Sequence, residues 1–357
     1  MAEVSYIFGD ILTGAIIEEI SLQGVSMTRG FGQGELRGSF QLDQSGKNND
    51  DLKAATEEGR CYVICIRDTV PIWGGFIWTR TYQSQAKVYQ LYCKAFEHYP
   101  EYRLILNDFE NLATEQRNIF LNLWTDMMSD PNSLQVTLPS SFSTEVTRDL
   151  TVKSFEYKRY RQSMDAIADG DDGFDWTIDV SVSGGVFSKS LRIGYPRLGS
   201  LEPLILYYDG EITNYWNNGS MAGRATHVYG VGAGEGSTML TQEVIHDDLV
   251  SSGFPRFDLA LSYKDINDAD LLTSLTVQSA RFRKSGVPIY TVEVKGDLEP
   301  EFGSYGLGDA VQIRFVNDPS HTNADSVFES RILGWEYYPP SDEHVEYARL
   351  VFEGDVS

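Results

Sequence analysis

Short stretches in which apolar and polar residues alternate recur through most of this sequence, and turn residues separate them. Residues 35–42 (Glu-Leu-Arg-Gly-Ser-Phe-Gln-Leu) alternate with period two, which is the pattern of a half-buried β-strand. Residues 72–80 and 87–94 have the same character and flank a polar turn at 83–86, so they predict a β-hairpin. Several short strands at this spacing are typical of a β-barrel or a β-sandwich.

A change of period in the middle of the chain indicates a different kind of structure. Apolar residues three or four positions apart predict an amphipathic helix over residues 109–129, with Asp108 as its N-cap. A short helix is expected at 163–168, and two alternating segments around Gly184-Gly185 predict another hairpin. We therefore expect residues 98–200 to form a compact α+β unit.

Strand patterns return after residue 200. They are predicted at 204–207, 225–229, 238–245 and throughout 289–352, with one helix predicted at 268–284. Gly59 and Gly308 each precede a predicted strand, and in both cases a further strand that contains glycine and tryptophan follows. This similarity favours a duplication of one small domain, although a glycine before a strand is a common arrangement.

The charge of the chain restricts what it can bind. The 357 residues include 52 acidic and 29 basic side chains, which give a net charge of −23. Surfaces that bind nucleic acid or anionic lipid need clustered Lys and Arg, so we expect neither specific nucleic-acid binding nor membrane insertion. Hydrophobic residues make up 41% of the sequence, which is too many for a disordered acidic chain. We expect a folded, soluble protein.

The cysteines and the first residues indicate the compartment. No basic segment followed by a long apolar run occurs at the start, so no secretory signal is expected. Cys61, Cys65 and Cys93 are odd in number, which favours reduced, buried thiols in a protein made in the cytosol. Cys61 and Cys65 are four positions apart in a predicted strand, so both are expected on its core face.

Motifs of common enzyme active sites are absent from the sequence. The five histidines have no metal-ligand spacing, and no zinc-protease, Cys-x-x-Cys or serine-esterase motif occurs. The segment 169–175 fails the helix–loop–helix calcium pattern, because Gly173 and Val180 stand where that loop needs oxygen ligands. We expect a turn there, with a weak surface cation as the alternative. We expect no catalytic residue, no cofactor and no resident metal.

A glycine-rich segment could be mistaken for a nucleotide-binding loop. In Gly230-Val-Gly-Ala-Gly-Glu-Gly236, Glu235 occupies the place of the last glycine of the dinucleotide motif. The segment also precedes a predicted strand and therefore lacks the helix N-terminus that binds phosphate. A flexible hairpin or bulge is expected here.

Four groups of short motifs follow one another over nearly the whole chain. They are Gly34-Glu-Leu-Arg-Gly-Ser-Phe-Gln-Leu42 with Gly59-Arg-Cys-Tyr-Val-Ile-Cys-Ile-Arg67 and Gly74-Gly-Phe-Ile-Trp78; the segment around Trp124 with Phe174-Asp-Trp-Thr-Ile-Asp179 and Gly194-Tyr-Pro-Arg-Leu-Gly199; the glycine-rich segment with Gly253-Phe-Pro-Arg256; and Tyr305-Gly-Leu-Gly-Asp309 with the closing strands. No single motif is specific. Their order resembles that of the tail-hub, or minor tail, proteins of long-tailed bacteriophages, especially phages that infect actinobacteria.

The resemblance implies a mainly β fold with α+β insertions. Two small β-barrel hub domains of similar fold would be joined by an α+β domain and a helical insertion. The implied domains are 1–97 (first barrel), 98–200 (α+β domain), 201–245 with 286–357 (second barrel) and 246–285 (helical insertion). The resemblance also implies a structural, non-enzymatic role as a homotrimeric ring at the distal end of the virion tail. That ring would be assembled in the host cytoplasm, close the tail tube and adapt its six-fold symmetry to three-fold.

The resemblance also implies the partners. They are the distal tail protein or tube ring, the tape-measure protein, and other tail-tip and receptor-binding proteins. DNA would pass through the lumen during ejection, and a negative wall would repel its phosphates. Residues 201–357 carry 25 acids and 10 bases, so this acidic half is expected to line the lumen. Trp73, Phe76, Tyr337 and Tyr338 are candidate subunit-interface residues, because obligate interfaces are large and apolar.

The alternative function is a carbohydrate-active or glycan-binding protein of host recognition. Aromatic side chains that could stack on sugar rings are Trp73, Trp78, Trp176, Trp216 and Trp335. A glycosidase would also need a pair of carboxylates, and the sequence does not single out a pair among its 52 acids.

Overall fold

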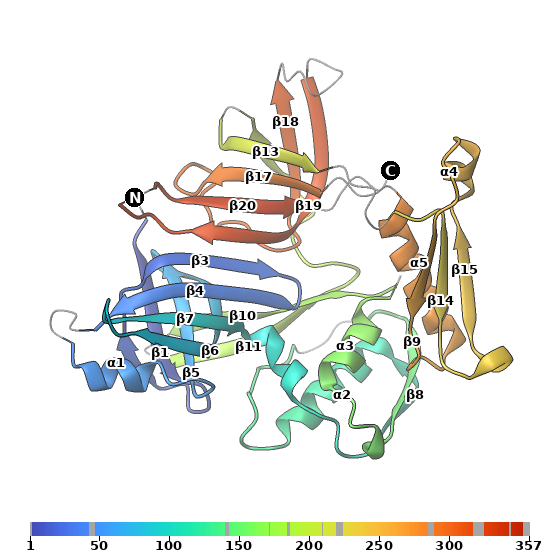
Figure 1. Ribbon diagram of the computed structural model, residues 1–357, viewed down its shortest axis with the longest axis horizontal. Helices are drawn as coiled ribbons and strands as arrows, with labels where there is room; N and C mark the ends of the chain where they lie inside the picture. Colours follow the sequence, from blue (N-terminus) through green and yellow to red (C-terminus); the bar gives the residue numbers. More distant parts are fainter. Residues whose placement is uncertain are drawn as a thin grey trace.

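The computed structural model describes residues 2–42, 47–139, 143–170, 172–183, 186–208, 210–218, 224–284, 289–316, 325–342 and 344–352. Over these residues most strands join one 13-stranded sheet, and the others form three sheets of two or three strands. Figure 1 shows the large sheet as two groups of strands on one side of the molecule, with helices below and a smaller sheet opposite. No helix within these ranges is long and apolar enough to cross a membrane.

The first unit of the large sheet is antiparallel throughout. Its strand order is β3-β4-β7-β6-β5-β1-β2. Its elements are β1 (Val4–Asp10), β2 (Ile16–Glu19), β3 (Gln23–Gly30), β4 (Gln33–Gln41), α1 (Asn49–Ala55), β5 (Cys61–Arg67), β6 (Val70–Gln83) and β7 (Val88–Ala95). The predicted strand at 35–42 is confirmed as β4, and the predicted hairpin is confirmed as β6–β7.

The second unit of the large sheet has the strand order β13-β17-β20-β19-β18-β12. Its elements are β12 (Leu204–Tyr207), β13 (Ile212–Asn218), β17 (Ile289–Lys295), β18 (Ala310–Val316), β19 (Asp325–Tyr338) and β20 (Tyr347–Phe352). The pairing of β12 with β18 is parallel, and the other pairings of this unit are antiparallel. The strands at 204–207 and after residue 289 were expected from the alternation, whereas β13 was not predicted.

The two units repeat one arrangement of strands. In chain order β1, β3, β4, β5, β6 and β7 correspond to β12, β13, β17, β18, β19 and β20, and the spatial order is the same. Gly59 donates its backbone N–H to the carbonyl of Ile77, and Gly308 donates to the carbonyl of Ile332 in the same way. Each of these acceptors directly precedes a β-bulge. The predicted duplication is therefore visible in the hydrogen bonding, although β1 runs antiparallel to β5 whereas β12 runs parallel to β18.

The two units form one continuous sheet, because β3 pairs with β19. Neither unit closes into a barrel through strand pairing of the described residues. The mainly β fold class with insertions is confirmed, whereas the expected barrels are open sheets. The pairing of β3 with β19 covers one sheet edge of each unit.

The α+β insertion lies between the two units in sequence. Its elements are η1 (Phe96–Tyr102), β8 (Phe109–Glu115), α2 (Gln116–Met128), β9 (Thr147–Val152), η2 (Ser154–Glu156), α3 (Tyr160–Ala168), β10 (Asp175–Ser183) and β11 (Val186–Gly194). The short helix and the hairpin β10–β11 are confirmed, while Gly184-Gly185 lies outside the described residues. The long predicted helix begins at Gln116, because β8 pairs with β9 instead. Asp108 accepts a hydrogen bond from the backbone N–H of Ser154 and caps no helix.

The helical insertion is larger than expected. Its elements are β14 (His227–Val231), η3 (Gly236–Thr238), β15 (Thr241–Ile245), α4 (Asp247–Ser251), β16 (Asp258–Ser262) and α5 (Ala269–Lys284). Residues 225–245 were expected in the second barrel, but β14 and β15 pair with each other and with β16 in a separate sheet. Figure 1 shows α5 lying along this sheet, apart from the second unit.

Strand β5 lies at the centre of the buried interior. Cys61, Val63 and Cys65 belong to the core that the two units share, whereas Tyr62 and Ile64 pack in the core of the α+β insertion. The strand is therefore covered on both faces. All three cysteines are buried and free, and the expected placement of Cys61 and Cys65 on one core face is confirmed.

Candidate functional site

The pairing of β3 with β19 joins the two units and defines the candidate site. Its register places Gly30, Arg29, Thr28 and Met27 opposite Gly334, Trp335, Glu336 and Tyr337. The junction requires glycine at Gly334, because a Cβ there would lie 2.9 Å from the carbonyl oxygen of Arg29. This distance between a Cβ at position 334 and the carbonyl oxygen of Arg29 is shorter than van der Waals contact. The backbones of β3 and β19 therefore approach each other closely here.

A buried ion pair supports the junction from the side of the second unit. The guanidinium of Arg67 binds Glu346 through Nε–Oε1 at 2.6 Å and Nη2–Oε2 at 3.3 Å. Tyr337 donates its hydroxyl to the same Glu346 Oε1 at 2.5 Å, and Arg67 also donates to the carbonyl of Gly296. Burial alone would lower the pKa of Arg67, but the hydrogen bond and charge of Glu346 raise it. The pair therefore fixes β5 of the first unit to the loops of the second.

A second polar cluster supports the junction from the side of the α+β insertion. The buried carboxylate of Glu97 accepts hydrogen bonds from the Thr177 hydroxyl at 2.8 Å and from the backbone N–H of Ile178 at 2.9 Å. Arg29, which lies in β3 at the junction, donates to the carbonyl of Ile178 at 2.7 Å and reaches Glu97 at 3.5 Å. The insertion thus holds β3 in place while β3 pairs with β19.

Three of the four predicted interface residues lie in the interior of the chain itself. Trp73 and Tyr337 are fully buried, and Phe76 is 5% exposed. Phe302 stacks on Tyr337 with ring centroids 4.6 Å apart, and the indole N–H of Trp73 donates to the carbonyl of Thr28. Their large apolar side chains are used to build the chain's own core, which corrects the prediction for these three residues.

Tyr338 is the one predicted interface residue that is partly exposed. Its ring stacks on Tyr347 at 4.5 Å, and the guanidinium of Arg349 lies over it at 5.3 Å from the centroid. The hydroxyl donates to Glu336 at 2.6 Å. Tyr338 is therefore held in a rigid surface cluster, and it stays a candidate contact.

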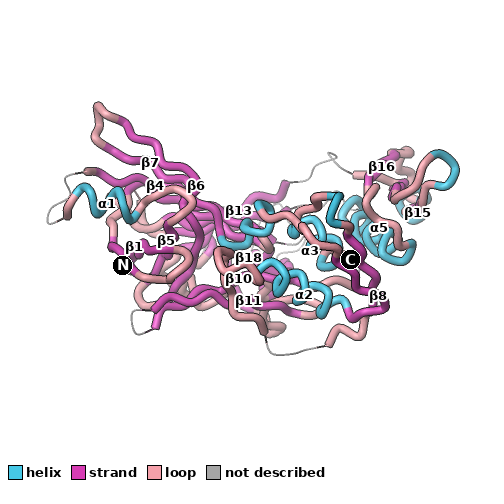
Figure 2. The backbone as a smooth tube through the Cα atoms, turned by 90° about the horizontal axis from the view of Figure 1, so that it is seen from below, coloured by secondary structure: helices cyan, strands magenta, loops and turns pink. Residues whose placement is uncertain are grey.

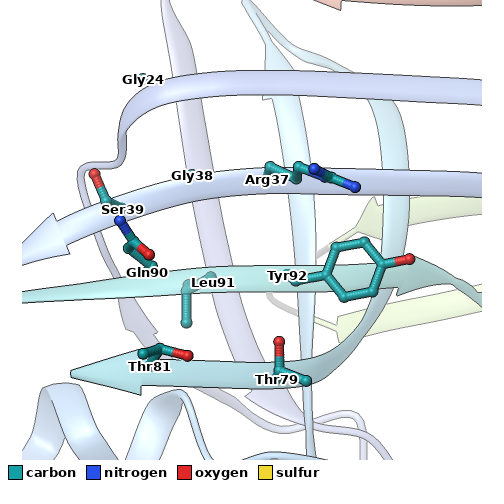
Figure 3. Close-up of a pocket in the computed structure, with 9 residues that line it drawn as sticks. All are labelled: Gly24, Arg37, Gly38, Ser39, Thr79, Thr81, Gln90, Leu91 and Tyr92. Carbon is teal, nitrogen blue, oxygen red and sulfur yellow. The ribbon is translucent and has the colours of Figure 1, made fainter. Parts of the chain in front are cut away.

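The first unit has a hollow polar face of its own. Figure 3 shows it across β3, β4, β7 and β6, with Thr79 and Thr81 on the last of these strands. The cavity has a volume of about 500 Å³ and is lined by Gly24, Arg37, Gly38, Ser39, Thr79, Thr81, Gln90, Leu91 and Tyr92. Tyr92 donates to Glu35 at 2.6 Å, and burial together with this contact raises the pKa of Tyr92 to about 12.

The five tryptophans proposed for sugar stacking are not gathered at one surface. Trp73, Trp176 and Trp335 are buried, while Trp78 and Trp216 are exposed. Trp78 stacks on Tyr102 at 4.5 Å, with the ammonium of Lys94 over the indole at 5.0 Å. Trp78 and Tyr102 line a mostly apolar cavity of about 600 Å³ that also contains Asp10 and Arg60.

The segment 169–175 lies beside a charged cavity of about 420 Å³. Asp165, Asp169 and Asp175 line it together with arginines that include Arg161 and Arg331, and Asp171 lies outside the described residues. Arg161 pairs with Asp165 at 2.6 Å, and Arg331 pairs with Asp175. Among the residues that the structure describes, no group of three or more His, Cys, Asp or Glu is arranged to hold a metal.

The glycine-rich segment has a structural use in the fold. It comprises the end of β14 and the turn toward β15. A Cβ at Gly230 would lie 1.9 Å from Oγ1 of Thr276, so glycine lets α5 approach β14 closely. His246, which directly precedes Asp247 and Asp248, is buried, and its Nε2 contacts the carbonyl of Ala280 at 2.9 Å.

No protein-family model matches this sequence, and no curated protein matches it in sequence. Solved structures do match. The 43 kDa tail protein of prophage MuSo2 from Shewanella oneidensis has a TM-score of 0.63 at 10% identity, over 98% of both chains. The tail protein from Neisseria meningitidis MC58 has a TM-score of 0.61 at 10% identity, over 98% of this chain and 97% of that one. The chain has a phage tail-protein fold.

A third tail protein agrees with this result. Prophage tail protein gp18 from Listeria monocytogenes has a TM-score of 0.55 at 9% identity, over 97% of this chain and 94% of that one. The tail-protein fold therefore spans both units and both insertions. The expected likeness to phages of actinobacteria has no support in these three structures.

The sequence did not predict that the edges of β3 and β19 pair to form the candidate site. Large aromatic residues predict a subunit contact, but the fold places three of the four candidates in the core. The available signal was the Gly59 and Gly308 similarity, because a duplication makes each edge of one unit comparable with an edge of the other.

Proposed function

We propose that this protein is a structural component of a phage tail, and that it forms the hub at the distal end of the tail tube. The observation that carries the proposal is the tail-protein fold, which extends over 97–98% of the chain in three prophage structures. Since the hub builds an assembly and does no chemistry, it is not an enzyme and uses no cofactor. It is a virion component that is assembled in the host cytoplasm.

The proposed assembly is a homotrimeric ring. Three chains with two similar units each present six similar surfaces, so the ring can meet a six-fold tube ring without six independent contacts. The duplication of strand order and of the Gly59 and Gly308 hydrogen bonds supports this arrangement. In this assembly the domains are the first unit at 1–97, the α+β insertion at 98–200, and the second unit after 200 with the helical insertion inside it.

The ring connects the tube to the tail tip. Its proposed neighbours are the distal tail protein or tube ring, the tape-measure protein, and other tail-tip and receptor-binding proteins. DNA passes through the lumen in transit and is not bound specifically. The net charge of −15 in residues 201–357, from 25 acids and 10 bases, supports a lumen wall that repels phosphate.

The stoichiometry and position of the chain in virions test the proposed function. We expect three copies per tail by quantitative mass spectrometry, and we expect loss of the chain when the distal end of the tail is removed. A chain that is absent from purified virions, or present in hundreds of copies along the tube, would contradict the proposal.

One cavity favours the alternative function. The stacked pair of Trp78 and Tyr102 beside Asp10 and Arg60 combines an aromatic platform with polar groups, which suits a sugar ring. A glycan array and a hydrolysis assay on host cell-wall polysaccharide test it, and Trp78→Ala is the matched variant. Binding that Trp78→Ala abolishes would favour a glycan-binding protein.

A further inference from the structure

We propose that two copies of this chain join by strand pairing, with β13 of one copy on the open edge of β6 in the next. The open edge is the backbone of residues 79–83 on the side away from β7. The inference rests on the proposed ring only for the number of copies, because the pairing itself follows from the duplication within one chain.

The equivalence of β6 and β19 locates the open edge. One edge of β19 is shared by two partners: β18 pairs with Asp325–Arg331 and β3 pairs with Gly334–Tyr337. On β6, the corresponding edge is paired with β5 over Val70–Phe76, and Gly59 continues this contact to Ile77. No strand among the described residues covers this edge beyond Ile77. The place that β3 fills on β19 is therefore empty on β6.

The equivalence of β3 and β13 identifies the strand that fits there. β3 pairs with β4 on one edge and with β19 on the other. β13 pairs with β17 on one edge and is the terminal strand of the large sheet on the other. Within one chain, β3 and β19 are paired with each other, whereas the equivalent strands β13 and β6 are not paired with each other. A second copy can supply a β13 for the open edge of β6, and the chain's own β13 can pair with the β6 of another copy.

The register follows from the two bulges. Ile77 and Ile332 precede the bulges on β6 and β19, so Thr81 corresponds to Glu336 and Tyr82 to Tyr337. In the same way, the positions opposite Arg37 and Thr291 make Ser26 of β3 correspond to Trp216 of β13. Since Met27 lies opposite Tyr337, Asn217 of one copy is expected opposite Tyr82 of the next, and Asn218 opposite Thr81.

The two open edges lack the protection that exposed edges usually carry. Edge strands are normally kept short or given charged residues, because their free N–H and C=O groups otherwise pair with other chains. β2, at the other end of the large sheet, has four residues and ends in Glu18 and Glu19. β13 has seven residues with no charge, and the open edge of β6 has only Arg80, whose guanidinium is bound to Glu58. Both edges are therefore built for a partner strand.

The surroundings of β6 leave room for that strand. Thr79, Thr81 and Tyr82 are exposed, and Tyr82 is 44% accessible despite its size. Figure 2 shows the hairpin of β6 and β7 projecting from the body of the molecule. Figure 3 shows Thr79 and Thr81 bordering the polar cavity, so an added β13 would extend the wall of that cavity.

Disulfide trapping tests the pairing and its register. Residues directly opposite in an antiparallel pair have Cα atoms about 4.5–5.5 Å apart, which is within reach of a disulfide. In the full-length chain, T81C with N218C is expected to give covalent dimers and trimers under mild oxidation. The native thiols do not interfere, because Cys61, Cys65 and Cys93 are all buried.

The matched control shifts the register by one residue. T81C with N217C places the two thiols on opposite faces of the sheet, so it is expected to give no cross-linked species. Cross-links from the in-register pair alone confirm the inference, while absent or equal cross-links from both pairs overturn it. Virion stoichiometry separates this outcome from the proposed function: three copies per tail without the in-register cross-link would reject the pairing and leave the hub intact.

Discussion

At the scale of single residues, the molecule uses buried charge to fix its two units. Arg67 is 6% exposed and Glu346 is 2% exposed, and each neutralises the other across the boundary between the units. Glu301 binds the same guanidinium at 3.1 Å, but its side chain is half-exposed. Because both fully buried partners have lost their hydration, the pair is costly to break from one side only.

Glu346→Gln is expected to destabilise the chain by about 3 kcal/mol, because it removes the one buried counter-charge of the Arg67 guanidinium and leaves only the half-exposed Asp68 and Glu301. The free energy of unfolding in urea measures the effect. Glu301→Gln is the control, since a partly exposed ion pair contributes at most about 1 kcal/mol. Equal losses for the two variants would show that the Arg67–Glu346 pair does not fix the units.

Lys189 makes stability depend on pH in the alkaline range. It is buried in β11, its ammonium lies 4.7 Å from the ring centroid of Phe187, and burial lowers its pKa to about 8. The unfolded chain, with a lysine pKa near 10.5, binds more protons than the folded chain between pH 8 and 10.5. The free energy of unfolding therefore rises with pH across that window. Below pH 8 the folded chain bears the full cost of burying the Lys189 charge.

Lys189→Met is expected to unfold with a free energy higher by roughly 2 kcal/mol at pH 7, since burial no longer acts on a charge. The gain should shrink as the pH rises from 8 to 10.5. Urea denaturation at pH 7, 9 and 10.5 measures it, with Arg192→Met on the same strand as the control. A gain that is constant over this range would contradict the assignment.

At the scale of elements, equivalent glycines of the two units differ in what surrounds them. Gly59 and Gly308 have φ of 72° and 88°, a region in which a Cβ is strained. A Cβ on Gly59 meets nothing within 4 Å, whereas on Gly308 it would lie 2.1 Å from the carbonyl oxygen of Leu198. The segment after β11 crosses the start of β18 at this point.

Gly59→Ala is therefore expected to cost about 1–2 kcal/mol from backbone strain alone. Gly308→Ala is expected to cost more, about 3 kcal/mol or above, because the backbone of the crossing segment must also move. The midpoints and slopes of urea denaturation compare the two. A smaller loss for Gly308→Ala would mean that the crossing segment does not pack on β18.

Elements with a clear period could be predicted from the sequence, and those fixed by distant partners could not. The alternation at 35–42 predicted β4, and the apolar spacing from Ile119 to Met127 predicted α2. The helix was extended too far because Leu112 fits the helical spacing, yet it is 58% exposed and its strand pairs with β9. Local pattern gives no information on such a pairing, which joins residues some 40 positions apart.

The candidate site was predicted less well than the fold. Trp73, Phe76 and Tyr337 are large and apolar, which suits an interface and a core equally. The sequence alone could not show that β5 is covered on both faces. The number of large apolar side chains that the chain's own two cores need was therefore not predictable. The strand edges are made of backbone groups, which leave no side-chain signature.

At the scale of the whole molecule, the duplicated sheet and the uneven charge agree with a ring. The in-chain junction of β3 with β19 and the proposed junction of β13 with β6 join equivalent strands in the same register, so the proposed ring has similar rotations between successive units. Such head-to-tail contacts close into a ring when the rotation fits. The more acidic second half is expected to face a solvated lumen, where its charges are screened over about 8–10 Å.

The structure of the assembled tail tip by electron cryo-microscopy tests the central claim most directly. The account predicts a closed ring of three copies in which six sheet units alternate, with β13 of each copy beside β6 of the next and an acidic lumen. A two-fold or five-fold arrangement of this chain, or a basic lumen, would contradict it.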